Sequence, residues 1–123
     1  MCLCMLQGRV TESGEPVIPI QLILQNQPSK GSATIDTGFN GYLSVPKPLL
    51  LRGEWKAIGT EKFEIATGAI VEQEIYFGEV LLDGRRSPVY SVATDAKDIL
   101  VGTKLLRSKI LTVNFRTKRV LIA

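Results

Sequence analysis

Short apolar segments that alternate with polar positions run along most of the chain. They are rich in β-branched and aromatic residues, which favour strands over helices. The first follows a break at Pro19, which cannot donate to a ladder and therefore predicts an edge or a bulge there. The pattern predicts an all-β fold whose strands contain QLILQ, SATID, EKFEIA, IVEQEIYF, SPVYSVA, KILTVNF and RVLIA.

Turn signals between these segments predict three hairpins. The hairpin tips are expected at Ser13-Gly14, Thr67-Gly68 and Asp83-Gly84. Asp-Gly is the dipeptide most typical of a type I′ turn, and the other two also supply a glycine where the chain has to reverse. Much of the chain is therefore expected to fold as antiparallel strand pairs.

Helix is scarce in this sequence. Pro48 to Arg52, closed by Gly53, and Thr103 to Arg107, with Thr103 as a possible N-cap, each read as a single helical turn. No linker, repeat or low-complexity tract interrupts the 123 residues, a length typical of one domain. We expect residues 1–123 to form one all-β domain with one or two short helical turns.

Composition and charge narrow the range of partners. Apolar residues make up 45% of the chain and charged residues 22%, which is typical of a soluble globular protein. The formal net charge is +3, without the concentrated cationic stripe that a phosphate backbone requires. The sequence has neither a basic leader nor a run of about eighteen apolar residues. We expect a cytoplasmic protein that binds neither nucleic acid nor membranes.

The chain contains no histidine. This removes the commonest general base, the usual partner of Ser and Cys nucleophiles, and the commonest zinc ligand. Catalytic triads and typical zinc hydrolases are thereby excluded. Cys2 and Cys4 are too close together for a normal disulfide framework and too few for a thiolate metal cage. Reduced thiols, no metal and no cofactor are expected.

Candidate chemistry therefore rests on carboxylates. Asp83 precedes a turn glycine, and Asp95 and Asp98 lie in a polar loop where a solvated charge is the ordinary interpretation. Asp36 differs because it ends an apolar strand and is followed by a hydroxyl residue and a glycine, in the triplet D-T-G. A strand end holds a carboxylate in a fixed position, so Asp36 is the candidate catalytic residue.

Two segments carry a resemblance to a known family. ATIDTGFNGYLSVP and, about sixty residues later, DILVGTKLLRSKILTVNF resemble the single-domain retropepsin-like aspartic proteases, particularly their small non-viral prokaryotic branch. The resemblance implies a closed acid-protease-like barrel in which Asp36 is catalytic. It implies that Thr37 braces the loop against its symmetry mate. Gly38 would leave room for a substrate and present backbone groups to it.

The resemblance also implies a hairpin flap over the cleft. Its best match is EIATGAIV, with Thr67 and Gly68 at the tip as substrate-binding residues, and the Asp83-Gly84 hairpin is the alternative. Viral members place an acid and an arginine, as a buried ion pair, where this chain has Asn40 and Thr103. Replacing both members of such a pair by neutral groups can be nearly neutral in stability. Asn40 is then a candidate substrate contact.

One D-T-G per chain implies two chains. Carboxylate-driven peptide hydrolysis needs one group to take a proton from water and another to give a proton to the carbonyl oxygen. A two-fold dimer brings two copies of Asp36 together. At a separation of about 4 Å and an effective dielectric of about 20, the two carboxylates repel by about 4 kcal/mol and would share one proton.

The sequence therefore predicts a homodimeric aspartic endopeptidase with peptide or protein substrates. The alternative is a non-enzymatic protease-fold module for dimerisation or peptide binding. A structural β-domain with an accidental triplet is a third possibility, although it requires both segments to match by chance. The C-terminal strands KILTVNF and RVLIA are candidates for pairing across the dimer, as termini do in viral members.

Overall fold

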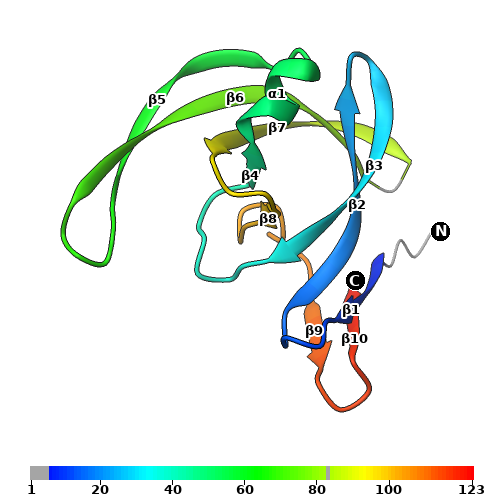
Figure 1. The fold of residues 1–123 in the computed structure, drawn as a ribbon. Helices are drawn as coiled ribbons and strands as arrows, with labels where there is room; N and C mark the ends of the chain where they lie inside the picture. The colour runs from blue at the N-terminus through cyan, green and yellow to red at the C-terminus, as the bar shows by residue number, and fades with distance from the viewer. Residues whose placement is uncertain (1–5, 83) are drawn as a thin grey trace.

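The computed structural model describes residues 6–82 and 84–123, so Cys2, Cys4 and Asp83 lie outside it (Figure 1). The all-β prediction is confirmed, and one short helix accompanies the strands. The described elements are β1 (Leu6–Val10), β2 (Pro16–Leu24), β3 (Gln27–Ile35), β4 (Leu43–Pro46), α1 (Lys47–Arg52), β5 (Lys56–Glu64), β6 (Ile70–Leu82), β7 (Arg85–Thr94), β8 (Ile99–Val101), β9 (Leu111–Asn114) and β10 (Arg119–Ile122).

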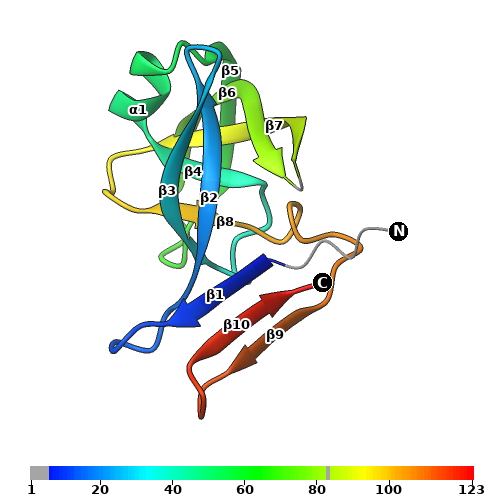
Figure 2. The same cartoon turned by 90° about the vertical axis from the view of Figure 1, so that its right-hand side faces the viewer.

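Strand pairing closes part of the sheet on itself. Among the described residues, β6, β7, β4, β8, β3 and β2 pair in that order, and residues 21–23 of β2 also pair with residues 79–81 of β6. The six strands therefore form a ring, as the expected closed architecture requires. β5 extends the sheet beyond β6, and β1, β10 and β9 extend it beyond β2 (Figures 1 and 2).

The short strand β8 occupies the place on which the rest of the fold depends. It pairs in parallel with β3, with Ile35 opposite Val101, and antiparallel with β4, with Leu43 opposite Val101. β3 and β4 are consecutive in sequence but separated in the sheet by β8. The chain between them, residues 36–42, must therefore pass around the end of β8, which carries Asp36 with it.

The three expected hairpins are present. β1 pairs with β2, β5 with β6 and β6 with β7, all antiparallel. α1 confirms the first helical turn and ends at Gly53, where a Cβ atom would lie 2.4 Å from Leu24 Cδ2. The second expected helical turn is wrong in detail. Residues 103–108 form successive turns instead, and the described hydrogen bonds include no cap from the Thr103 side chain.

Pro19 does not break its strand. β2 continues through it and pairs with β3 without interruption, Pro19 lying opposite Ser32. On its other side, β2 pairs with β1 at residues 16–17 and with β6 at residues 21–23. Residues 18–20 have no described strand partner on that side, so the expected edge exists as a gap three residues long.

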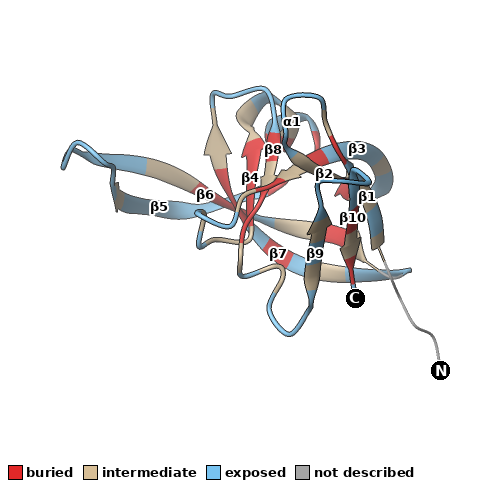
Figure 3. Ribbon diagram, turned by 90° about the horizontal axis from the view of Figure 1, so that it is seen from below, coloured by how far each residue is buried: buried red, intermediate tan, exposed pale blue. Residues whose placement is uncertain are grey.

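The core is built mainly from the strands of the ring, with further buried residues from β1, β10 and α1 (Figure 3). Leu43, Val45 and Leu50 are completely buried there. Trp55, the single tryptophan, anchors the chain after α1 because it is buried and its Nε1–H donates to the carbonyl oxygen of Ile23 at 2.8 Å. Trp55 therefore covers part of the core and ties the start of the β5–β6 hairpin to β2.

Candidate active site

Asp36 follows β3 directly and is tied to β8. Its backbone N–H donates to the carbonyl oxygen of Val101 at 2.9 Å, which continues the β3–β8 ladder by one bond. Asp36 is half-buried, whereas Thr37 and Gly38 are exposed. The D-T-G triplet therefore begins on a rigid strand and ends at the molecular surface, where a second chain can reach it.

The segment that follows β8 clamps the rest of the loop. Three consecutive N–H groups donate to loop carbonyl oxygens, and we call this set the loop clamp: Gly102 to Tyr42 at 3.0 Å, Thr103 to Phe39 at 2.9 Å and Lys104 to Gly41 at 3.1 Å. The described part of the chain shows no side-chain hydrogen bond between Asn40, which is exposed, and Thr103. Main-chain bonds thus stand where the viral pattern has an ion pair.

Gly102 leaves the space that the clamp needs. A Cβ atom on Gly102 would lie 2.2 Å from the carbonyl oxygen of Gly41 and 2.8 Å from that of Phe39. Backbone atoms cannot move aside as a flexible side-chain end can. Glycine is therefore required here for close approach, which is a physical reason for the apolar-apolar-glycine pattern at residues 100–102.

The carboxylate of Asp36 is oriented by its own loop. The N–H of Gly38 donates to Asp36 Oδ1 at 2.9 Å, and the N–H of Phe39 donates to the carbonyl oxygen of Asp36 at 3.1 Å. Such a local turn is a common use of aspartate side chains. A Cβ atom on Gly38 would lie 3.2 Å from Oδ1, so glycine also allows the carboxylate to fold back onto the loop.

The β5–β6 hairpin ends at Thr67 and Gly68, as expected. Gly68 has φ +85°, a conformation that favours glycine, and its N–H donates to the carbonyl oxygen of Ile65 at 2.8 Å. The described hydrogen bonds include none between this tip and the 36–42 loop, so the structure does not join Thr67 or Gly68 to Asp36. Figure 1 shows the hairpin extending from the ring on the same side as that loop.

An ion pair lies nearer the base of the hairpin. Lys47 Nζ and Glu74 Oε1 are 2.6 Å apart and link α1 to β6, with each side chain 44% exposed. The hydrogen bond that Lys47 donates to Glu74, together with the negative charge of Glu74, raises the pKa of Lys47 above its ordinary value. Because solvent screens an exposed pair, we assign it a positioning effect and little stability.

An aromatic row beside the loop was not anticipated from the sequence. The ring centroids of Tyr42 and Tyr90 are 6.1 Å apart, and those of Phe77 and Tyr90 are 5.3 Å apart. Lys104 Nζ lies 5.8 Å from the Tyr42 ring centroid, within cation–π range. Only the strand register reveals this row, because Phe77 and Tyr90 are opposite each other on β6 and β7.

Within residues 6–82 and 84–123, no three His, Cys, Asp or Glu side chains are grouped so as to hold a metal ion. In the same residues, no helix has the length and apolar character needed to cross a bilayer.

Comparison with solved structures defines the class of fold. A retropepsin-like aspartic protease from Rickettsia conorii superposes with a TM-score of 0.66 at 12% identity, over 96% of this chain and 89% of that one. The simian foamy virus (mac) protease gives 0.53 at 20% identity, over 72% and 90%. The foamy viral protease–reverse transcriptase gives 0.55 at 14% identity, and the match covers 73% of this chain but 11% of that much longer one.

These likenesses confirm the predicted fold: the chain has a retropepsin-like fold. At such low identities the shared feature is the fold, and the activity of this chain has to be argued from its own residues. No protein-family model matches the sequence, and no characterised protein matches it by sequence.

The loop clamp predicts different outcomes for two glycine substitutions. Gly102→Ala forces backbone apart, and overpacking of this kind costs about 1–3 kcal/mol or more. Gly31→Ala is the matched control, because its Cβ would meet nothing nearer than 3.8 Å. In urea unfolding followed by circular dichroism, we expect a clear loss of stability for Gly102→Ala and almost none for Gly31→Ala. Equal stabilities for the two variants would contradict the clamp.

Proposed function

We propose that the chain is an aspartic endopeptidase that acts as a homodimer of single-domain protomers, with Asp36 as its catalytic residue. The observation that carries the proposal is the D-T-G aspartate at the end of β3, oriented by Gly38 and held against β8, in a retropepsin-like fold. The absence of histidine leaves a carboxylate as the most suitable general base in the chain.

The proposed reaction uses two Asp36 side chains that share one proton. The ionised carboxylate takes a proton from a water molecule, whose oxygen attacks the peptide carbonyl carbon, while the protonated carboxylic acid gives its proton to the carbonyl oxygen. The tetrahedral intermediate collapses when a proton passes to the amide nitrogen and the C–N bond breaks. Each carboxylate thus exchanges roles, so the pair must titrate as a unit.

Sheet topology supports β9 as the seam between protomers. The two edge strands of the described sheet are β5 and β9, and β5 belongs to the hairpin that we assign as the flap. β10 already pairs on both sides, with β1 and with β9, so it is not free to pair across a dimer. β9 retains an unpaired edge, and the exposed apolar residues Ile110 and Phe115 flank it. An isologous β9–β9 contact satisfies two-fold symmetry.

We assign Thr67 and Gly68 to the tip of a flap and Asn40 to a contact with the substrate backbone. The exposed Ile65, directly after β5, and Ile70, the first residue of β6, flank the tip. Burying them against an extended peptide would gain apolar contact and exclude water from the cleavage site. The substrate class is therefore a peptide segment lying between the flap and the Asp36 loop.

Replacing the proposed catalytic group tests the activity. Asp36→Asn removes both the base and the shared proton, so we expect cleavage of casein or a peptide library near pH 5 to fall at least about 10²-fold. The control is Asp95→Asn, which removes an exposed loop carboxylate and should leave cleavage unchanged. A hydroxyl-containing transition-state mimic should inhibit the wild type. Full activity in Asp36→Asn would reject the assignment, and peptide binding without cleavage by the wild type would support the non-enzymatic module.

Substituting the residues beside β9 tests the seam. Ile110 and Phe115 are 71% and 64% exposed, and replacing both with Asp places two like charges at each end of the proposed contact. We expect the dimer dissociation constant to rise at least about 10²-fold in sedimentation, and cleavage to fall with it. Leu51→Asp is the control, since Leu51 is 56% exposed on α1. A dimer that tolerates the double variant would exclude this seam.

The shared proton predicts how dimerisation depends on pH. The dimer holds one proton between its two carboxylates, whereas separate protomers release it, so raising the pH favours the protomers. We expect wild-type dimerisation to be strongest at acidic pH and to weaken steadily towards alkaline pH at fixed salt. Asp36→Asn carries no charge there and should lose this dependence. Dimerisation that strengthens with pH, or identical profiles for the two proteins, would contradict a shared proton.

A further inference from the structure

A large apolar hollow has no residue of the 36–42 loop among its described lining residues, although Val101, which bonds Asp36, lies in its wall. It has a volume of about 750 Å³ and opens beside β2, between the terminal strands, the β6–β7 turn and the turns that follow β8. This size is within the range of about 300–1,000 Å³ typical of pockets for small molecules. Its apolar wall is formed by Leu6, Ile18, Leu81, Leu105, Leu106 and Ile122.

The gap in strand pairing at Pro19 creates this hollow. Between the β1 and β6 partners of β2, residues 18–20 have no described strand beside them, and Ile18, Pro19 and Ile20 all line the space. An added peptide strand would find a gap of three residues whose central residue has no N–H to donate. The hollow is therefore poorly suited to a peptide and better suited to an apolar chain.

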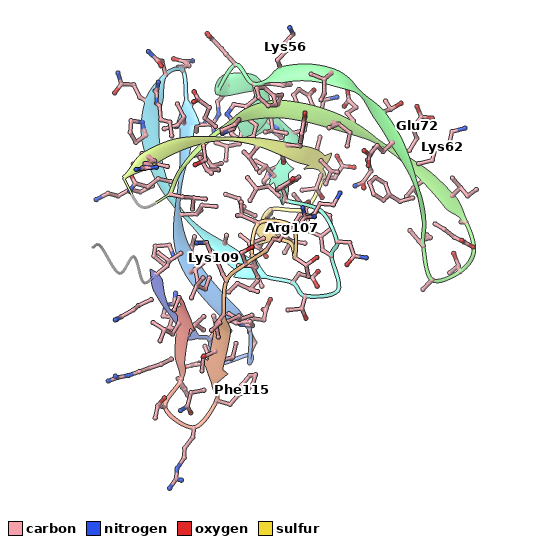
Figure 4. All side chains as sticks on the ribbon, turned by 180° about the vertical axis from the view of Figure 1, so that it is seen from behind. Lys56, Lys62, Glu72, Arg107, Lys109 and Phe115 are labelled. Atoms are coloured by element: carbon pink, nitrogen blue, oxygen red, sulfur yellow. The ribbon has the colours of Figure 1, made fainter. Side chains whose placement is uncertain are left out.

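Three cations are among the described residues that line the hollow. Lys30 lies on β3, Arg85 on β7 and Lys109 in the segment before β9, and all three are exposed. No acidic side chain is among its described lining residues, and within the described chain none of these three cations is in a salt bridge. Figure 4 shows Lys109 between β2 and the turns that follow β8. An apolar wall with a cationic rim complements a ligand that has an apolar tail and one acidic head.

We propose that this hollow binds a long-chain carboxylate. The aliphatic tail lies along the partly exposed Leu81, Leu105 and Leu106, and the carboxylate is held at the rim by Lys109 with Lys30 or Arg85. Charge-assisted contacts of this kind are the stronger class of hydrogen bond in proteins. The site is separate from the proposed protease chemistry, and it can be occupied whether or not the chain cleaves peptides.

The test is calorimetric titration with dodecanoate, below its micelle concentration, against the full-length chain. We expect one site per chain, and binding about fourfold weaker for each methylene removed from the tail. Lys109→Ala combined with Arg85→Ala should weaken dodecanoate at least about tenfold, because head-group contacts are lost. Lys118→Ala combined with Arg116→Ala removes two equally exposed cations from the β9–β10 turn and should change nothing.

Two further measurements test the tail site and the head site separately. Leu106→Trp should fill the hollow and reduce dodecanoate binding without removing charge. Dodecyltrimethylammonium has the same tail and the opposite charge, and it should bind at least about tenfold more weakly than dodecanoate. Equal binding of the two amphiphiles would overturn the acidic-head assignment. No dodecanoate binding, together with altered self-association in Leu106→Trp, would show instead that a second copy of the chain covers this surface.

Discussion

The insertion of β8 between β3 and β4 is the constraint on which the rest of the structure depends. Those two strands are neighbours in sequence, and separating them obliges residues 36–42 to travel around the end of β8. The loop clamp then fixes this detour with main-chain bonds from the residues that follow β8. Backbone groups that would otherwise lie unpaired at the end of a sheet are satisfied there. The carboxylate of Asp36 is therefore positioned by topology and needs no large set of side-chain partners.

The tip of the loop that carries Asp36 is exposed, although the loop itself is held firmly. Asp36 is half-buried and Thr37 is exposed, although Ala33 and Ile35 at the end of β3, which leads into them, are buried. In a single chain the carboxylate has one described donor, the N–H of Gly38. A site with one acid per chain is chemically incomplete for a reaction that takes and gives a proton at once. The same geometry that leaves the site incomplete also leaves it accessible to a second copy.

The alternating pattern and turn signals predicted the strands, the three hairpins and α1, because each is specified within a few neighbouring residues. Residues 103–108 were expected to form a helical turn, but their main-chain bonds, such as Leu105 N–H to Gly102 and Leu106 N–H to Thr103, span three residues and the segment forms successive turns. Pro19 correctly signalled missing pairing, but the strand continues because β3 supports it from the other side. Local signals cannot show a partner that lies far along the sequence.

Some parts of the candidate site could be predicted from the sequence and others could not. The D-T-G triplet singled out Asp36 at a strand end, and the apolar-apolar-glycine segment singled out Gly102, because residue identity alone carries those signals. The sequence did not reveal the clamp partners or the aromatic row, because both depend on which strands meet. The clamp partners are Phe39 and Gly41, and the row is formed by Tyr42, Tyr90 and Phe77. Gly41 offered one detectable hint, a second glycine three residues after that of the triplet. The turn of the β5–β6 hairpin at Thr67 and Gly68 was located correctly, whereas its role as a flap stays a prediction.

The loop clamp also suits the chemistry proposed for the site. A buried ion pair in this position would include a carboxylate, and its contribution to stability would fade as the pH fell and that carboxylate took up a proton. Two carboxylates that share one proton work best under acidic conditions, where such a pair is weakest. The N–H and carbonyl groups of the clamp do not titrate, so the loop keeps its shape across the working range. Replacement of both charged positions, by Asn40 and Thr103, therefore leaves the support of Asp36 independent of the proton on which its catalysis would depend.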